Sequence, residues 1–165
     1  MPKYLSINSD VSKIKAVFFD FDGVFTDNKV YLTQEGLELV SCSRYDGYGL
    51  KFLQSKSITL AVISSEQVSI ASLRCKKLGI PCFQPIEDKL SFAIDYLNSF
   101  GLTLGQLCYM GNDINDLALL QACALPVIPS DSHISLLAKD FYITKSGGGH
   151  GCVRELADHF SQFSL

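Results

Sequence analysis

The chain has 165 residues, of which 47% are hydrophobic and 19% are charged, and its formal net charge is -3 at neutral pH. This composition predicts one globular domain, residues 1–165, with a sizeable core, and it excludes a largely disordered chain. The slight acidity, without any run of Lys or Arg, disfavours binding to nucleic acid or to a membrane surface.

Six cysteines are spread along the chain without C-x-x-C spacing, mostly in apolar stretches where a free thiol acts as a small hydrophobic group. The sequence shows no signal-peptide pattern before the first predicted strand and no apolar run long enough to cross a bilayer. We therefore expect reduced cysteines and a cytoplasmic location.

The first predicted strand sets the pattern for the rest of the chain. Residues 1–12 have mixed polarity and predict a loose arm, after which residues 15–20 form an apolar run that ends in Asp20. Apolarity on both faces is typical of the buried centre of a parallel sheet. Asp22 lies on the same side of the chain as Asp20, and Gly23 allows a sharp turn between them and Thr26. Two close carboxylates favour a cation, and oxygen ligands suit Mg²⁺.

Residues 28–43 predict a β-hairpin, because two runs with strand character flank a turn that contains glycine. An isolated hairpin is marginal in water, so it should pack on something. Exposed apolar strands often mark an interface, and we expect this one to contact another copy of the chain. The apolar residues concerned are Val30, Leu32, Leu37 and Leu39.

From residue 46 onward, predicted helices and strands alternate. Helices are expected near residues 46–54, 67–78, 87–100, 117–122, 134–138 and 153–160, and strands near 59–63, 82–84, 106–110, 125–128 and 141–143. This order predicts an α/β fold with a doubly wound parallel sheet, a projecting hairpin and no cap domain. The intervals 27–64 and 64–89 are too short for a separate lid.

Several polar residues share a position at or just after a predicted strand end: Asp20, Asp22, Ser64, Lys89, Asp113 and Asp116. In a parallel sheet these ends meet along one rim. One carboxylate can attack phosphorus, a second can transfer protons, and a hydroxyl and an ammonium can hold phosphoryl oxygens. Mg²⁺ between Asp20 and Asp113 would reduce the charge repulsion.

Each of these residues also has a simpler interpretation. Ser64 alone is an ordinary strand-end serine, Lys89 next to Asp88 is a surface pair, and Asp113 with Asp116 is a helix cap. The ordered set is far less expected by chance than any single member, so we interpret it as a phosphoryl-transfer site.

The motifs resemble the haloacid dehalogenase superfamily of phosphohydrolases over about residues 14–156. Asp20-x-Asp22-Gly-x-x-Thr26 resembles the first motif, Ser64 the second, Lys89 the third, and Gly111-Asn112-Asp113-x-x-Asp116 the fourth. The resemblance implies that Asp20 is the nucleophile and Asp22 the acid/base. It also implies a metal held by Asp20, the backbone carbonyl of Asp22 and Asp113, with Asn112 and Asp116 in support. Many members carry Asp where this chain has Asn112, so its metal affinity can differ.

Residues 19–27, 46–49 and 148–155 resemble a narrower, capless branch that dephosphorylates 3-deoxy-2-ulosonic acid phosphates. The branch implies a homotetramer in which a neighbouring subunit closes the rim, with residues 147–151 or Arg154. It also contains the C-terminal domain of some CMP-sialate synthetases, so a non-catalytic assembly module is one alternative. A phospho-receiver domain is another, disfavoured by the hairpin that follows the Asp-x-Asp-Gly turn.

The predicted substrate contacts are Thr26, Ser65, Glu66, Arg74, Lys77 and Arg154. Glu66 should accept hydrogen bonds from sugar hydroxyls, while Arg74 and Lys77, neighbours on a helix, should attract a sugar carboxylate unless they lie on a solvated face. An acid at position 66 with this basic pair resembles nonulosonate-type members. We therefore expect a nonulosonate 9-phosphate, with 3-deoxy-D-manno-octulosonate 8-phosphate as the alternative.

Overall fold

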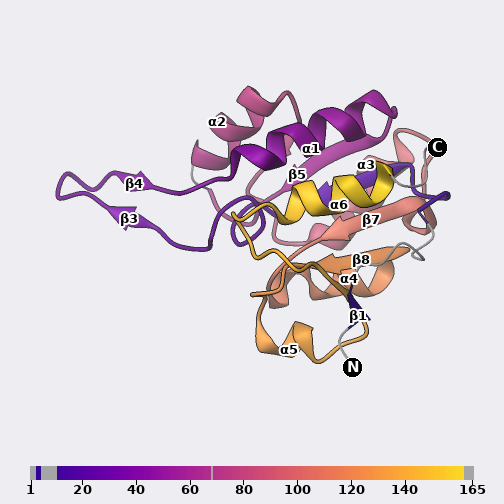
Figure 1. Ribbon diagram of the computed structural model, residues 1–165. Coiled ribbons are helices and arrows are strands. Elements are labelled where there is room, and N and C mark those ends of the chain that lie inside the picture. The colour runs from indigo at the N-terminus through magenta and orange to yellow at the C-terminus, as the bar shows by residue number, and fades with distance from the viewer. Residues whose placement is uncertain (1–2, 5–10, 68, 162–165) are drawn as a thin grey trace.

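The computed structural model describes residues 3–4, 11–67 and 69–161. Within these residues seven strands form a parallel sheet in the order β1-β9-β8-β7-β2-β5-β6. The strands are β1 (Lys3–Tyr4), β2 (Ala16–Phe19), β5 (Thr59–Ile63), β6 (Cys82–Phe83), β7 (Leu107–Met110), β8 (Leu125–Ile128) and β9 (Tyr142–Ile143). The predicted doubly wound parallel sheet is confirmed (Figure 1).

Strand β2 lies inside this sheet, between β7 and β5, at the point where the strand order reverses. The chain runs from β2 to β5 and β6 on one side, and continues as β7, β8 and β9 on the other. Phe19, the last residue of β2, stands opposite Val62 of β5 and Met110 of β7, so the three strands end nearly level. Such a switch point at the carboxyl edge is where open α/β sheets bind ligands.

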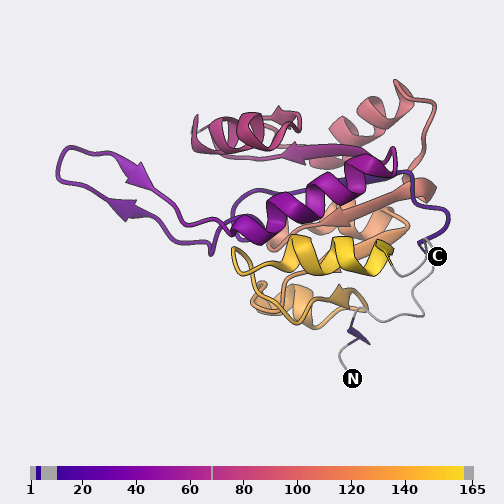
Figure 2. The ribbon, with the colours of Figure 1, turned by 45° about the horizontal axis from the view of Figure 1, so that its top comes forward.

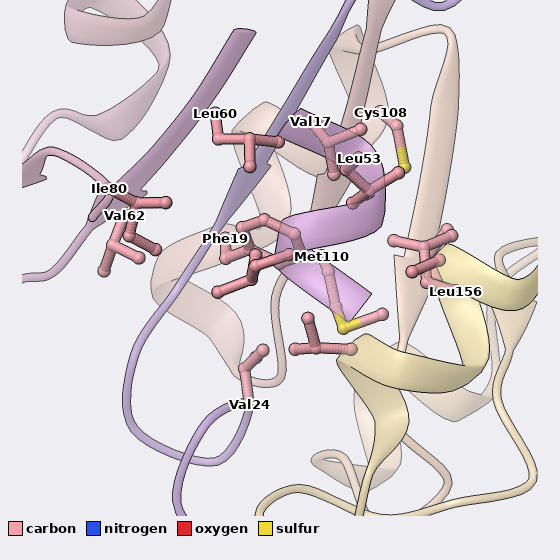
Figure 3. Close-up of a cluster of buried hydrophobic side chains, with 14 of the residues drawn as sticks. Val17, Phe19, Val24, Leu53, Leu60, Val62, Ile80, Cys108, Met110 and Leu156 are labelled. Carbon is pink, nitrogen blue, oxygen red and sulfur yellow. The ribbon is translucent and has the colours of Figure 1, made fainter. Parts of the chain in front are cut away.

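Helices cover both faces of the sheet, which explains why β2 is apolar throughout. Val17 and Phe19 pack with α1 (Arg44–Ser55), α2 (Ser69–Leu78) and α6 (Cys152–Ser161), as Figure 3 shows for part of this cluster. Ala16 and Phe18 pack on the opposite face. The helices there are α3 (Lys89–Asn98), α4 (Leu117–Ala122) and α5 (Ile134–Leu137). Successive residues of β2 point to opposite faces of the sheet, and each face packs against an apolar layer. Side chains on both faces of the strand must therefore be hydrophobic.

The predicted hairpin is also confirmed. Strands β3 (Tyr31–Leu32) and β4 (Glu38–Leu39) pair antiparallel, and a bridge between Thr26 and Cys42 closes the base. The hairpin extends away from the sheet and helices (Figures 1 and 2). Its apolar side chains, expected to be covered, are exposed in the single chain.

The loose arm predicted for residues 1–12 is wrong in two places. Lys3–Tyr4 pairs in parallel with Tyr142–Ile143, and Val11 is buried in the core. A strand at the edge of a sheet offers unpaired backbone groups, and β9 uses them to bind β1. Residues 1–2 and 5–10 lie outside the described residues. Among the described helices, none has the length and apolar character needed to span a membrane.

Candidate active site

Thr26 braces the turn that follows β2. Its hydroxyl oxygen accepts hydrogen bonds from the Gly23 and Asn28 amides, at 3.1 and 3.2 Å, and donates to Asp22 Oδ1 at 3.3 Å. Thr26 is fully buried. The sequence analysis predicted a substrate contact here, but the structure places the side chain beneath the turn, where it sets the position of Asp22.

A buried lysine lies between two carboxylates at the end of the sheet. Lys89 Nζ is 2.9 Å from Asp20 Oδ1 and 2.7 Å from Asp116 Oδ1, and only 2% of the Lys89 surface is exposed. Burial raises the pKa of Asp20 to about 7, with the charge of Asp116 adding to this and Lys89 opposing it. Burial alone would lower the pKa of Lys89, but the two carboxylates outweigh it and raise that pKa above its usual value.

Asp116 is the anchor of the fourth-motif loop. Besides Lys89, its Oδ1 accepts a hydrogen bond from the Tyr109 hydroxyl at 2.6 Å. Its Oδ2 accepts from the amides of Asn112 at 2.8 Å and Asp113 at 3.2 Å. Sequence reasoning missed Tyr109, because an aromatic residue in an apolar strand has the pattern of an ordinary core residue.

The fourth motif presents Asn112, rather than Asp113, to the first motif. The Asn112 amide atom that faces this turn lies 3.2 Å from Asp20 Oδ2 and 2.9 Å from the Asp22 carbonyl oxygen. Asp113 caps the 3-10 turn Ile114–Asp116, and its Oδ1 accepts from the Ile114 amide at 2.7 Å. Its carboxylate still lines the same cavity. The geometry therefore favours Asn112 over Asp113 as the motif-four partner of the two aspartates.

These atoms fit a divalent cation. With nitrogen towards the turn, the Asn112 amide donates to both oxygens. With the amide turned over, three oxygens converge from Asp20, the Asp22 carbonyl and Asn112. Octahedral ligands at 2.1 Å are about 3.0 Å apart, close to the spacing seen here. The parts of the chain that the structure describes contain no cluster of three His, Cys, Asp or Glu side chains able to hold a metal. Carbonyl and amide oxygens would complete the ligand set.

A small polar cavity opens at this edge of the sheet, with a volume of about 150 Å³. It is lined by Asp20, Asp22, Asn28, Ser64, Ser65, Glu66, Asn112, Asp113 and Asn115. The side-chain amide of Asn115 donates a hydrogen bond to Ser65 Oγ at 3.0 Å, which connects the second motif to the fourth. Burial raises the pKa of Asp22, against the hydrogen bond from Thr26, so this carboxyl is suited to proton transfer.

A second cavity of about 340 Å³ adjoins the first and shares Asp22, Asn28 and Glu66 with it. It lies between the base of the hairpin and α2, and Lys29 is the single cation among the described residues that line it. The sequence analysis missed Asn28 and Lys29 as site residues. Asn28 has φ of 61°, a left-handed conformation that Asn adopts more readily than most residues, so the residue type was the only signal that the sequence offered.

Three predicted substrate residues lie outside these two cavities. Arg74 and Lys77 line a separate groove of about 310 Å³ between α1 and α2, and Arg154 Nε pairs with Asp158 Oδ1 at 2.7 Å. Helical spacing shows that Arg74 and Lys77 share a face, but it does not show where the face points. Within one chain, these residues therefore do not reach the site that the sequence analysis assigned to them.

Residues 147–151, which the sequence analysis proposed as a contact with a neighbouring subunit, make a contact within their own chain. Gly149 donates from its amide to the Val24 carbonyl at 3.0 Å, so this loop packs on the first-motif turn of its own chain. The reason is that β9 and α6 both belong to this domain, and the short loop between them must cross the carboxyl edge of the sheet.

Comparison with known proteins places the chain in a family, although no protein-family model matches it. The 3-deoxy-D-manno-octulosonate 8-phosphate phosphatase KdsC of Yersinia pestis is 32% identical over 148 residues, which is 89% of this chain and 79% of the relative. A HAD family hydrolase structure from Streptomyces avermitilis is 30% identical, with a TM-score of 0.89 over 95% of this chain and 90% of that one. The chain belongs to the haloacid dehalogenase superfamily of phosphatases.

The likeness extends to a structure that contains ligands. The 3-deoxy-D-manno-octulosonate 8-phosphate phosphatase of Moraxella catarrhalis, in complex with magnesium, phosphate and KDO, is 28% identical with a TM-score of 0.87. The match covers 92% of this chain and 88% of that one. This haloacid dehalogenase family member is therefore a phosphoric monoester hydrolase, and the predicted capless superfamily fold is confirmed.

Replacing Lys89 should destabilise the protein, because Asp20 and Asp116 would then be buried without a neutralising cation. We expect Lys89→Met to lower the free energy of unfolding by about 3–5 kcal/mol in urea titrations at pH 8. The loss should be smaller at pH 5, because a proton on Asp20 then neutralises one carboxylate. Lys139→Met, at an exposed site, should change stability by less than about 0.5 kcal/mol. Equal losses at both pH values would contradict the charge argument.

Proposed function

We propose that the protein is a Mg²⁺-dependent phosphatase that hydrolyses a 3-deoxy-2-ulosonic acid phosphate through an aspartyl-phosphate intermediate. The observation that carries this proposal is the polar cavity in which Asp20, held by Lys89, faces Asp22 and Ser64. An activated carboxylate, a proton donor and two groups for phosphoryl oxygens are the parts that such a reaction requires.

Asp20 is the nucleophile in this mechanism, and it must be ionised to attack phosphorus. Lys89 holds one Asp20 oxygen at 2.9 Å and leaves the other towards Asn112. When bound, Mg²⁺ supplies positive charge that offsets the repulsion between Asp20 and the phosphate. Attack forms the aspartyl phosphate and breaks the bond from phosphorus to the sugar oxygen.

Asp22 transfers the protons in both steps. Burial raises its pKa, which favours the protonated form that gives a proton to the leaving sugar oxygen. The resulting carboxylate then takes a proton from the water that attacks the aspartyl phosphate, which restores Asp20 and releases phosphate. Thr26, which binds Asp22 Oδ1, fixes the direction of this carboxyl group.

Ser64 completes the phosphate site. The residue is buried at the end of β5, and its oxygen accepts from the Glu66 amide at 3.2 Å. That bond leaves the hydroxyl proton free to be donated to a phosphoryl oxygen in the cavity. Ser64 and the Lys89 ammonium together would hold the oxygens as charge moves during transfer.

We infer that the substrate is 3-deoxy-D-manno-octulosonate 8-phosphate, the compound in the name of the Yersinia pestis relative. The expected nonulosonate preference rested partly on Arg74 and Lys77, which lie in another groove. In one chain, Lys29 is instead placed to attract the sugar carboxylate in the 340 Å³ cavity, while Glu38 and Glu66 accept from hydroxyls.

We also propose a homotetramer. Val30, Leu32 and Leu39 of the hairpin are 55%, 72% and 57% exposed, and no cap domain stands beside them within the described residues. Burial of such a surface against another copy stabilises assembly. A neighbouring copy would then be the source of any contact that Arg74 or Lys77 makes with the substrate.

Asp20→Asn tests the nucleophile, and chelation tests the metal. The amide cannot attack phosphorus, so phosphate release should fall to the uncatalysed level while the circular dichroism spectrum stays native. Excess EDTA should abolish wild-type turnover, and added Mg²⁺ should restore it. Asp95→Asn, an exposed change on α3, should keep full activity. Wild-type rates from Asp20→Asn, or in EDTA, would reject the mechanism.

The substrate is tested by kcat/KM for the eight-carbon 8-phosphate and a nonulosonate 9-phosphate. We expect the eight-carbon substrate to be preferred. Lys29→Met should raise KM about tenfold for both with little change in kcat, because the lost ion pair lies far from phosphorus. Lys51→Met, in the separate groove, is the matched control. A preference for the nine-carbon substrate would reverse the substrate assignment.

Light scattering tests the assembly. The wild type should have the mass of a tetramer, and Leu32→Asp with Leu39→Asp should dissociate it, because each places a charge in the contact. Ile134→Asp, at an equally exposed position on α5, should leave the mass unchanged. A monomeric wild type with full activity would refute the proposed role of the hairpin.

A further inference from the structure

The glycine-rich loop 147–151 lies directly against the turn that carries Asp20 and Asp22. The Val24 carbonyl in that turn accepts two hydrogen bonds, from the Gly149 amide at 3.0 Å and from the Cys152 thiol at 3.3 Å. Gly149 lies in the segment that joins β9 to α6, and Cys152 is the first residue of α6. A part of the chain that is distant in sequence therefore holds this turn in place.

The contact leaves no room for side chains. A Cβ at Gly148 would overlap the Gly23 carbonyl group and lie 2.8 Å from the Thr26 carbonyl oxygen. Gly149 has φ of +68°, and a Cβ there would be 2.5 Å from the Asp27 amide nitrogen. Backbone touches backbone, so a displacement of the loop is passed to Gly23, whose neighbour Asp22 carries the proton donor and the carbonyl that faces Asn112.

Asp131 fixes this loop. Its Oδ1 accepts a hydrogen bond from the Gly148 amide at 2.9 Å, from an exposed turn that follows β8. The same turn is tied to the fourth motif, because the His133 amide donates to the Asn112 carbonyl at 2.9 Å. Residues 129–133 thus connect the two sides of the catalytic cavity through one side-chain bond and one backbone bond.

We propose that Asp131 is a positioning residue of this enzyme. By holding Gly148 against Gly23, it keeps the turn with Asp20 and Asp22 in register with Asn112. The inference rests on the proposed function, since it concerns the same reaction. One partly buried hydrogen bond contributes only a small part of the global stability, but a displacement of about 1 Å in a catalytic group can reduce turnover about a hundredfold.

The acceptor oxygen, rather than the charge, gives Asp131 this role. Asp131→Ala should lower kcat about tenfold while KM changes less than threefold, because the phosphate pocket remains and only the alignment of the reacting groups changes. Asp131→Asn keeps an oxygen for the Gly148 amide and should retain more than half of the wild-type kcat. The melting temperature of both variants should stay within a few degrees of wild type.

A second pair of variants tests the contact from the other side. Gly148→Ala should lower kcat by about a hundredfold, because its methyl group forces the loop and the Gly23 carbonyl apart. Gly105→Ala is the matched control, since its nearest neighbour, Thr103 Oγ1, is 3.6 Å from a new Cβ. This control should keep the wild-type kcat.

The outcomes separate the two proposals. If the wild type releases phosphate and Asp131→Ala has the same kcat, the positioning role is overturned while the proposed function stands. If Asp131→Asn is as impaired as Asp131→Ala, the hydrogen bond is not the cause and the inference also fails. A wild type that hydrolyses no sugar-acid phosphate with Mg²⁺ would overturn the proposed function and this inference together.

Discussion

The buried ammonium of Lys89 is the interaction on which the site depends. Asp20 and Asp116 come from different strand ends, and without a cation between them their charges could not both be buried. Asp116 also holds the Tyr109 hydroxyl and the backbone of Asn112. One ion cluster therefore sets the relative positions of the first, third and fourth motifs.

Close contacts to the backbone also hold the site together, in addition to the ion cluster. Gly23 and Gly111 let Asn112 and Asp116 approach the turns, since a Cβ at either glycine would meet those side chains. At the other end, Asp46 of α1 accepts from the Arg154 amide at 3.1 Å and so fixes the start of α6, just after the glycine-rich loop. The turn that carries Asp20 and Asp22 is thus packed on both sides by elements of the same chain, without a cap domain in the described residues.

Much of this architecture followed from the sequence because its signals are local. Apolar runs of four or five residues predicted the central strands. Because parallel strands end together, Asp20, Ser64 and Lys89 were expected near one another, and the structure has Asp20 and Ser64 in one cavity with Lys89 paired to Asp20. Side-chain direction could not be predicted in the same way. Arg74 and Lys77 share a helical face that turns towards α1, and Asn112 rather than Asp113 faces the turn, because these directions depend on tertiary packing.

Asn112 has a further consequence for the charge of the site. Burial and the charge of Asp116 already raise the pKa of Asp20 to about 7, even though Lys89 opposes the shift. An aspartate at position 112 would add another negative charge within about 3 Å of Asp20 and raise that pKa further. An amide supplies a ligand oxygen without this penalty. On the proposed mechanism, Asn112 attracts the cation less strongly than an aspartate would, but it makes Asp20, the nucleophile, easier to ionise.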